Sequence, residues 1–177
     1  FAYHMGIVGR EIAFVSTDGL HRAKIISDSI VELKMSDSLK VIELDCGAFF
    51  VNTGSPHYVN YLDNIDDIDL IKQARVIRNS PEYIEEGINV NFIEKINENI
   101  KMRTYERGVE NETLSCGTGV TAAALVQASN LAKEEGEVEV FTRGGELSVS
   151  FAFDGKCFQD VWLKGSAVYV YKGEIDG

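Results

Sequence analysis

The chain has 177 residues, of which 45% are hydrophobic and 25% are charged, and its formal net charge is −11. This length provides one ample hydrophobic core or two small ones, and the composition is that of a globular protein. The negative charge argues against nucleic acid or an anionic membrane surface as a partner, and no apolar stretch reaches the length of a membrane span.

The N-terminal third reads mainly as short strands. Residues 1–6 read as the last turns of a helix closed by Gly6 in the left-handed conformation. This helix end has no beginning, so we expect the natural protein to extend upstream of Phe1. Antiparallel strands are predicted at 11–17, 20–27 and 29–36, with a turn at Asp18-Gly19, and the polar residues 36–38 are the expected domain boundary.

The remainder is predicted to contain two helices among further strands. Apolar residues at helical spacing and early acids predict a helix over 66–78, and an Ala-rich helix is predicted from 116 to about 131. Its small residues allow close packing inside a curved sheet. The expected strands are 40–45, 49–53, 88–94, 100–106, 136–142, 146–153, 157–163 and 167–171. These elements predict an α/β (α+β) fold, with a mostly antiparallel sheet around one helix.

Cys116 is the first candidate for chemistry. It precedes the Ala-rich helix in a Cys-Gly-Thr-Gly turn, where a thiol faces unpaired N–H groups and the positive end of the helix dipole. This setting favours the thiolate, and the same N–H groups can bind a carboxylate. An isolated cysteine is more often a buried core residue, but the flanking Gly117-Thr118 and the nearby Glu106-Arg107 pair favour a functional thiol.

Three other groups of residues are weaker candidates. Arg107 can hold a carboxylate through two parallel N–H bonds, and Glu106 can exchange a proton or anchor an ammonium group, although the two also suit an ordinary surface ion pair. In the loop Gly54-Ser55-Pro56-His57, the histidine can shuttle a proton or orient a ligand, or simply be solvated or cap an element. Asn89 or Asn91 can donate to a ligand, or be an edge residue of a strand.

The remaining histidines and cysteines are read as structural or inert. His4 and His21 have no comparable neighbours, and Cys46 and Cys157 lack a basic or glycine-rich setting. The spacing of the acids in 63–69 does not fit a calcium loop, and no metal site is expected. Three well-separated cysteines without zinc-ligand spacing favour a reducing cytoplasm.

Several segments together resemble the diaminopimelate epimerases. The matching segments, in family-like order and spacing, are GSPH (54–57), NVNF (89–92), YERGV (105–109), ETLSCGTG (112–119) and, like the family's last strand, GSAVYVYKGEI (165–175). The resemblance implies an isomerase that converts LL-2,6-diaminopimelate to the meso isomer without a cofactor, for lysine and peptidoglycan precursors. It also implies two pseudo-symmetric halves, each a curved sheet around a central helix. Residues 1–37 with 167–177 would be a remnant of the first half, and 38–166 the complete second half.

By the same resemblance, one cysteine from each half faces the substrate α-carbon, and Cys116 is the second-half proton donor in the LL-to-meso direction. Gly117 and Thr118 would contact the α-carboxylate. Arg107 with Asn89 would hold the distal end of the substrate, a small diamino dicarboxylate. His57 and Glu106 would support the reacting amino group and the thiols. The resemblance is also compatible with a homodimer.

This chain departs from the family pattern in three places. The first catalytic cysteine, in a Cys-Gly-Asn-Gly type motif, would lie upstream of Phe1, so we expect the 177 residues alone to be inactive. Ser55 stands where the family usually has Asn, which leaves a hydroxyl contact in place of an amide contact. Glu110-Asn111 makes the stretch after Arg107 one residue longer than the commonest form.

Two other functions remain open. A proline or hydroxyproline racemase has similar halves and a similar cysteine turn, but it typically has Asp-Arg-Ser-Pro where this chain has Glu112-Thr113-Leu114-Ser115. A non-catalytic protein that captures a small carboxylate at its helix N-termini would use the same scaffold.

Overall fold

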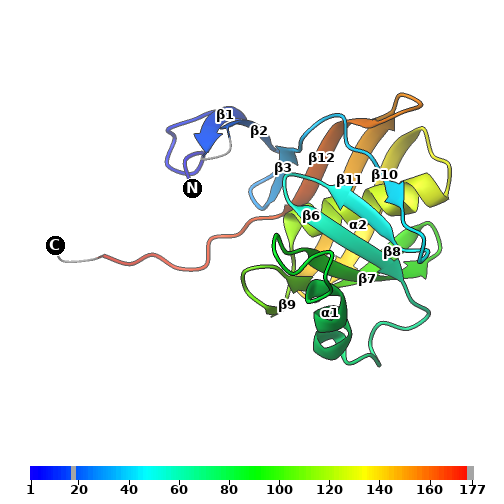
Figure 1. The fold of residues 1–177 in the computed structure, drawn as a ribbon. Coiled ribbons are helices and arrows are strands. Elements are labelled where there is room, and N and C mark those ends of the chain that lie inside the picture. Colours follow the sequence, from blue (N-terminus) through cyan, green and yellow to red (C-terminus); the bar gives the residue numbers. More distant parts are fainter. Residues whose placement is uncertain (17–18, 175–177) are drawn as a thin grey trace.

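The computed structural model describes residues 1–16 and 19–174, which form two helices and a 12-stranded sheet (Figure 1). The helices are α1 (Leu70–Arg78) and α2 (Gly117–Asn130). The strands are β1 (Glu11–Ser16), β2 (Gly19–Ile25), β3 (Ile30–Lys34), β4 (Ile42–Glu43), β5 (Phe49–Asn52), β6 (Pro56–Tyr61), β7 (Asn89–Ile96), β8 (Asn99–Glu106), β9 (Asn111–Thr113), β10 (Glu135–Thr142), β11 (Gly145–Phe153) and β12 (Phe158–Ser166).

The sheet is mostly antiparallel, as predicted. Its strands run in the order β1-β2-β3-β12-β11-β10-β8-β7-β6-β5-β4. The short strand β9 pairs with the C-terminal end of β8. Two neighbouring pairs, β6 with β7 and β8 with β10, are parallel. Since α1 connects β6 to β7 and α2 lies between β8 and β10 in the chain, each parallel pair is joined by a crossover that contains a helix.

Helix α2 lies inside the curve of this sheet (Figure 1). Every residue from Gly119 to Ala128 is buried, and the helix contacts strands on both sides of the bend, β5 to β8 and β10 to β12. Three alanines in the middle of the helix let the strands approach closely on all sides. A helix that is apolar all round must be buried, so the sheet has to wrap around it. The predicted α+β architecture is confirmed.

Helix α1 starts later than the predicted 66–78. Asp69 is its N-cap, and the Asp69 Oδ1 atom accepts a hydrogen bond from the Lys72 N–H at 3.1 Å. The acids before it therefore precede the helix and do not belong to its first turn. Asp66 instead forms an ion pair with Lys101 on β8. The buried face of α1 packs on β7 and β8 through Leu70 and Ala74.

Two strands were not predicted, and one predicted strand is absent. β6 begins at Pro56, a position where a strand tolerates proline, whereas the sequence reading placed a loop there. β9 has only three residues. The strand expected at 167–171 is wrong: residues 167–174 have no regular structure and are exposed, with Val170 and Tyr171 83% and 84% accessible. A run of β-branched and aromatic residues forms a strand only beside a neighbour, and none of the described strands pairs with this segment.

The N-terminal segment has the hydrogen-bond pattern expected at a helix end, but residues 2–6 form turns and no helix. Gly6 has a φ of +70°, and the Ile7 N–H bonds to the Ala2 carbonyl at 2.9 Å while the Gly6 N–H bonds to the Tyr3 carbonyl at 3.0 Å. This pair of bonds is the Schellman pattern of a helix C-terminus.

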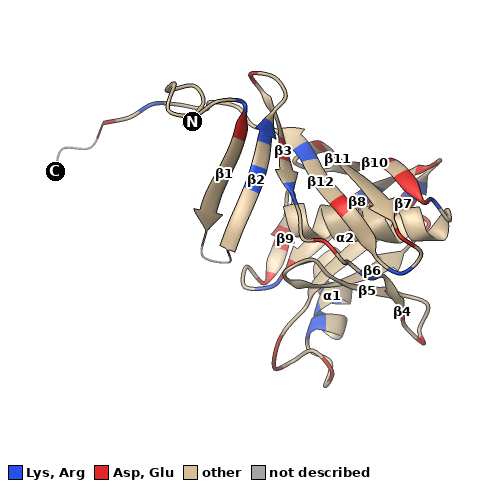
Figure 2. Ribbon diagram, turned by 90° about the horizontal axis from the view of Figure 1, so that it is seen from above, with Lys and Arg blue, Asp and Glu red and all other residues tan. Residues whose placement is uncertain are grey.

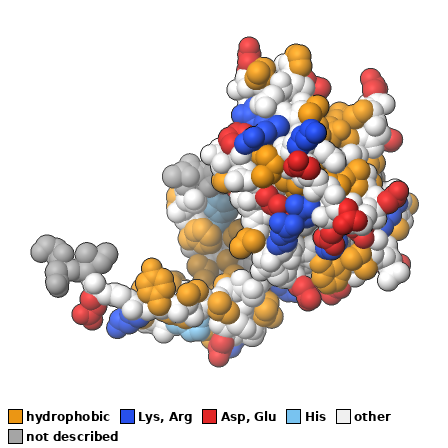
Figure 3. Space-filling model, turned by 90° about the horizontal axis from the view of Figure 1, so that it is seen from below, with side chains coloured by type: hydrophobic (Ala, Val, Ile, Leu, Met, Phe, Trp, Pro, Cys, Tyr) orange, Lys and Arg blue, Asp and Glu red, His pale blue; other side chains and the backbone are white. Residues whose placement is uncertain are grey.

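The β1–β2 hairpin projects from the rest of the molecule (Figures 1 and 2). Of its predicted turn at Asp18-Gly19, Asp18 lies outside the described residues. β3 joins the hairpin to β12, so the sheet is continuous across the expected boundary at 36–38. Hydrophobic side chains are exposed on this projecting part and on the C-terminal segment, including Phe14, Val15, Leu20 and Val168 (Figure 3).

Neither of the helices within 1–16 and 19–174 is long and apolar enough to cross a membrane.

Candidate active site

Cys116 caps the N-terminus of α2. It has extended backbone angles, φ −133° and ψ 110°, and its carbonyl accepts the first helical bond, from the Val120 N–H at 2.8 Å. Its side chain makes no capping bond; instead the Sγ atom lies 3.4 Å from the Thr118 Oγ1 atom. The side chain is 9% accessible. The thiol therefore sits beside the first turn of the helix, where N–H groups lack intrahelical partners.

Gly119 lets β7 approach this turn closely. A Cβ atom on Gly119 would lie 2.7 Å from the Asn91 Oδ1 atom and 3.4 Å from the Cys116 Sγ atom. Real Cβ atoms essentially never approach an oxygen so closely, so only glycine fits without a shift of Asn91. The second Gly of the Cys-Gly-Thr-Gly turn thus sets the contact between the cysteine turn and the polar residues of β7.

His57 lies on β6 and is completely buried. Both of its ring nitrogens have protein partners: Nε2 lies 2.9 Å from the Ser55 Oγ atom, and Nδ1 lies 3.2 Å from the Asn91 Nδ2 atom. Burial first, and then the positive charge of Arg107, lower the pKa of His57 to about 3. The ring is therefore neutral at pH 7.

Asn89 connects the Ser55 loop to Arg107. Its Nδ2 atom donates to the Ser55 Oγ atom at 3.1 Å and to the Pro56 carbonyl at 3.0 Å, and its Oδ1 atom accepts from the Arg107 backbone N–H at 2.9 Å. The parallel register of β6 and β7 sets His57 directly beside Asn89. Four of the predicted site residues thus belong to one hydrogen-bonded network.

The side chains of Glu106 and Arg107 diverge from each other. Arg107 donates from Nη1 to the Glu86 carbonyl at 2.9 Å, and its stem passes over Gly87, where a Cβ atom would meet the Arg107 Cδ atom at 2.6 Å. The Glu106 Oε2 atom accepts from the Thr113 hydroxyl at 2.9 Å. The two do not form the ion pair that was the ordinary alternative for them.

A cavity of about 960 Å³ opens beside this network, between the β1–β2 hairpin and the body of the molecule. Thr53, Ser55 and Thr118 line one side, and Arg22 and Lys34 line the other. The Thr53 hydroxyl donates to the Thr118 carbonyl at 3.1 Å, which ties the Ser55 loop to α2. Of the predicted site residues, Ser55 and Thr118 line this cavity, whereas Cys116 and His57 are buried and do not line it.

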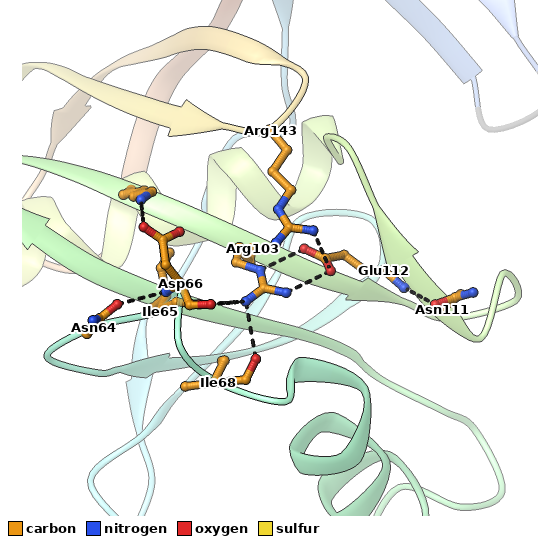
Figure 4. A network of polar contacts seen from close by, with 9 residues as sticks. Asn64, Ile65, Asp66, Ile68, Arg103, Asn111, Glu112 and Arg143 are labelled. Atoms are coloured by element: carbon orange, nitrogen blue, oxygen red, sulfur yellow. Dashed lines mark hydrogen bonds and ion pairs between the residues drawn. The ribbon is translucent and has the colours of Figure 1, made fainter.

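The loop that leads to Cys116 is fixed by an ion-pair cluster (Figure 4). Arg103 on β8 is 7% accessible and holds Glu112 through two bonds, Nε–Oε1 at 2.7 Å and Nη2–Oε2 at 2.8 Å. Its Nη1 atom donates to the Ile65 carbonyl at 2.6 Å, and Arg143 reaches the Glu112 Oε2 atom at 2.9 Å. Hydrogen bonding from Arg103 and the nearby positive charges lower the pKa of Glu112.

Sequence reasoning did not select Arg103, Glu112 or Thr53 as site residues. Asn91 was noted but not placed in the site, although two asparagines at period-two spacing share one face of a strand. That spacing, in a strand with both side chains buried, is the signal that predicts a shared network. Cys46 is exposed, and a hydrogen bond with Tyr58 and one with the Ala48 backbone lower the pKa of its thiol.

Comparison with known families identifies one family. A family model described as diaminopimelate epimerase matches residues 49–170. A relative from Flavobacterium psychrophilum named diaminopimelate epimerase is 36% identical over 176 residues, which cover 99% of this chain and 68% of that protein. One of the same name from Aquifex aeolicus is 37% identical over 185 residues, covering 99% of this chain and 65% of that protein. The chain thus spans about two thirds of the length of these relatives.

Solved structures share the fold at low sequence identity. A phenazine biosynthesis protein of the PhzF family from Bacillus anthracis has a TM-score of 0.69 at 14% identity, with 96% of this chain and 70% of that chain covered. A hydroxyproline epimerase from Agrobacterium vitis, solved with trans-4-hydroxy-L-proline, has a TM-score of 0.65 at 14% identity, with 93% and 60% covered.

Proposed function

Because this chain belongs to the diaminopimelate epimerase family, we propose that it supplies one of the two thiols of an epimerase that converts LL-2,6-diaminopimelate to the meso isomer in lysine and peptidoglycan precursor biosynthesis. The observation that carries this proposal is the position of Cys116. Within the matched region, it caps α2 beside a network that joins Ser55, His57, Asn89 and Arg107.

In the proposed mechanism, a thiolate on one face removes the α-proton, and a thiol on the opposite face donates a proton to the carbon. Cys116 is the donor in the LL-to-meso direction and, by reversibility, the base in the meso-to-LL direction. The N–H groups at the start of α2, including those of Gly117 and Thr118, bind the α-carboxylate. The positive end of the helix dipole stabilises the charge that develops as the proton leaves. A single base would return the proton to the face it left, so inversion requires two opposed sulfurs.

The remaining residues hold the substrate. Arg107 binds the distal carboxylate as a two-pronged donor together with Ser55, and Asn89 holds both residues in place through its hydrogen bonds. Glu106 is an acceptor for an ammonium group, and His57 supports the site through its hydrogen bonds. We further propose that residues 1–37 with 167–177 belong to one half and 38–166 to the other, that the protein works in the cytoplasm, and that a homodimer is its assembly state.

Deuterium exchange tests the role of Cys116. When the chain is incubated with meso-diaminopimelate in D2O, proton NMR should show exchange at one α-carbon, and chiral chromatography should show no inversion. Cys116→Ala should abolish the exchange, and Cys157→Ala, the matched control, should leave it unchanged. Inversion by these 177 residues would refute the need for two thiols, and exchange that survives in Cys116→Ala would refute the assigned role.

Calorimetric titration separates the two other candidate functions. Tighter binding of trans-4-hydroxy-L-proline than of diaminopimelate would favour a proline-type racemase. Binding of diaminopimelate without any α-carbon exchange would favour a carboxylate-binding protein.

A further inference from the structure

The orientation of the Asn91 amide is fixed by a neighbour that can only accept. One amide atom of Asn91 lies 3.0 Å from the Tyr58 carbonyl oxygen, so that atom must be the NH2 nitrogen. The Asn91 Oδ1 atom on the other side accepts from the Thr104 hydroxyl at 3.0 Å. The Asn91 Nδ2 atom lies 3.2 Å from the His57 Nδ1 atom, so its second hydrogen is available for a bond to that ring nitrogen.

This contact sets the tautomer of His57. Because Asn91 donates to Nδ1, that ring nitrogen must be the acceptor and carries no hydrogen. Burial keeps the ring neutral, so its single hydrogen is on Nε2. The Nε2–H group lies 2.9 Å from the Ser55 Oγ atom, and Ser55 is therefore an acceptor in this bond.

A second donor occupies the other lone pair of Ser55. The Asn89 Oδ1 atom accepts from the Arg107 backbone N–H, which can only donate, so the other amide atom of Asn89 is nitrogen. This nitrogen donates to the Pro56 carbonyl and to the Ser55 Oγ atom, at 3.0 and 3.1 Å. A hydroxyl has two lone pairs and one hydrogen, so both acceptor positions of Ser55 are filled by protein donors.

We propose that Ser55 is a dedicated hydrogen-bond donor to an acceptor atom of the ligand, and that Asn91 and His57 are the positioning residues that make it so. Ser55 lines the 960 Å³ cavity, whose other lining residues include Arg22 and the ion pair of Lys34 with Asp37. A carboxylate oxygen is a ligand atom that can accept from the remaining O–H group of Ser55, whereas an ammonium group would meet no acceptor at Ser55. The assignment of this carboxylate to diaminopimelate rests on the proposed function. The direction of the hydrogen bonds follows from the contacts of Asn91, His57 and Asn89 and is independent of that function.

The tautomer of His57 can be read without a ligand. Long-range 1H–15N correlation spectra of the imidazole distinguish Nε2–H from Nδ1–H, and we expect Nε2–H in the unaltered chain. Asn91→Asp places a carboxylate opposite Nδ1 and should put a hydrogen on that nitrogen, while Ser55→Ala should leave the ring with its hydrogen on Nε2 only. A ring that carries its hydrogen on Nδ1 in the unaltered chain would overturn the proposal, whether or not the Asn91→Asp chain folds.

Calorimetric titration with meso-diaminopimelate tests the donor role. Ser55→Ala should weaken binding about 10-fold, the ordinary contribution of a hydrogen bond to a charged group, about 1.4 kcal/mol. Ser55→Asn, whose amide also donates, should restore most of the affinity. Asn91→Leu removes the donor to Nδ1 and with it the constraint that keeps the hydrogen on Nε2, so it should also weaken binding, by no more than Ser55→Ala does. The double variant of Ser55→Ala and Asn91→Leu should bind no more weakly than Ser55→Ala alone.

The outcomes of the two experiments are separable. Unaltered affinity in Ser55→Ala, or additive losses in the double variant, would overturn the donor role. Absence of diaminopimelate binding to the unaltered chain would overturn the proposed function and the ligand named here. The ring spectrum would still decide the direction of the hydrogen bonds by itself.

Discussion

Gly119 is the residue at which α2 and β7 come closest together. In most helices, Gly→Ala stabilises by about 1 kcal/mol through helix propensity. Here the added Cβ would lie 2.7 Å from the Asn91 Oδ1 atom, and Asn91 is held by hydrogen bonds to three neighbours. We therefore expect Gly119→Ala to lower the free energy of unfolding by about 1–3 kcal/mol, as overpacking in a core does.

Urea unfolding monitored by circular dichroism measures this effect. Gly9→Ala is the matched control, because nothing lies within 4 Å of the Cβ position at Gly9 and its φ is not in the left-handed region. An Ala variant at 119 that is as stable as the control would show that Asn91 can move away at little cost.

His57 should make stability depend on pH. Its pKa is about 3 in the folded chain, compared with 6.5 for an unperturbed histidine. Between these values the unfolded state binds the extra proton, so stability is full above about pH 6.5 and falls as pH decreases. The slope approaches about 1.4 kcal/mol per pH unit, and the total loss approaches roughly 4 kcal/mol near pH 3.

The free energy of unfolding, measured between about pH 7.5 and about pH 5, tests this slope before most carboxylates titrate. The His57→Asn variant should give a flatter profile over the same range. Parallel profiles for the two proteins would mean that another group binds the proton.

At the scale of elements, Arg103 on β8 forms an ion pair with Glu112 on β9, the short strand that precedes Cys116. Removal of Glu112 would leave a guanidinium that is 7% accessible without its carboxylate partner. We expect Glu112→Ala to cost about 3 kcal/mol of unfolding free energy, the usual penalty for breaking a buried pair. Arg143→Ala removes the more exposed partner of the same carboxylate and should cost less than about 1 kcal/mol.

Thermal unfolding of both variants at matched salt provides the comparison. Equal losses of stability in Glu112→Ala and Arg143→Ala would show that the buried Arg103–Glu112 pair contributes no more to stability than the exposed Arg143–Glu112 pair.

The elements differ in how far the amino-acid pattern predicts them. The period-two alternation of β7 and β8 and the Ala-rich run of α2 are local signals, and the predicted bounds are close to those observed. β6 was missed because Pro56 and Gly54 are turn signals, although proline can start a strand. Residues 167–171 are rich in valine and tyrosine, as strands are, but pairing requires a neighbour, which no local pattern can supply.

The sequence predicts individual residues of the site more readily than the hydrogen bonds that connect them. Cys116, Ser55 and Arg107 stood out by residue type and setting. The bonds that orient Ser55 depend on the register of β6 against β7, which brings His57 beside Asn89 from 32 positions away in the chain. Pairing registers of this kind follow from packing of the whole sheet, so the donor role of Ser55 could not be read from the sequence.

At the scale of the whole molecule, the body and the C-terminal segment should differ in resistance to proteases. Tyr169 and Tyr171 are 53% and 84% accessible in a segment without regular structure, whereas Tyr105 and Phe92 are each 1% accessible in the core. Brief treatment with chymotrypsin should therefore cleave first after Tyr169 or Tyr171 and leave the body intact. Mass spectrometry identifies the cut, and first cleavage within β7 or β8 would contradict this arrangement.

The burial of α2 on all sides also affects how the chain is made. β10, β11 and β12, which cover much of the helix, follow it in the sequence. On a ribosome, residues 117–130 therefore emerge before those strands exist, and the nascent helix has no polar side to turn toward water. The interval until Ser166 has been translated is the stage of synthesis at which a chaperone would matter most.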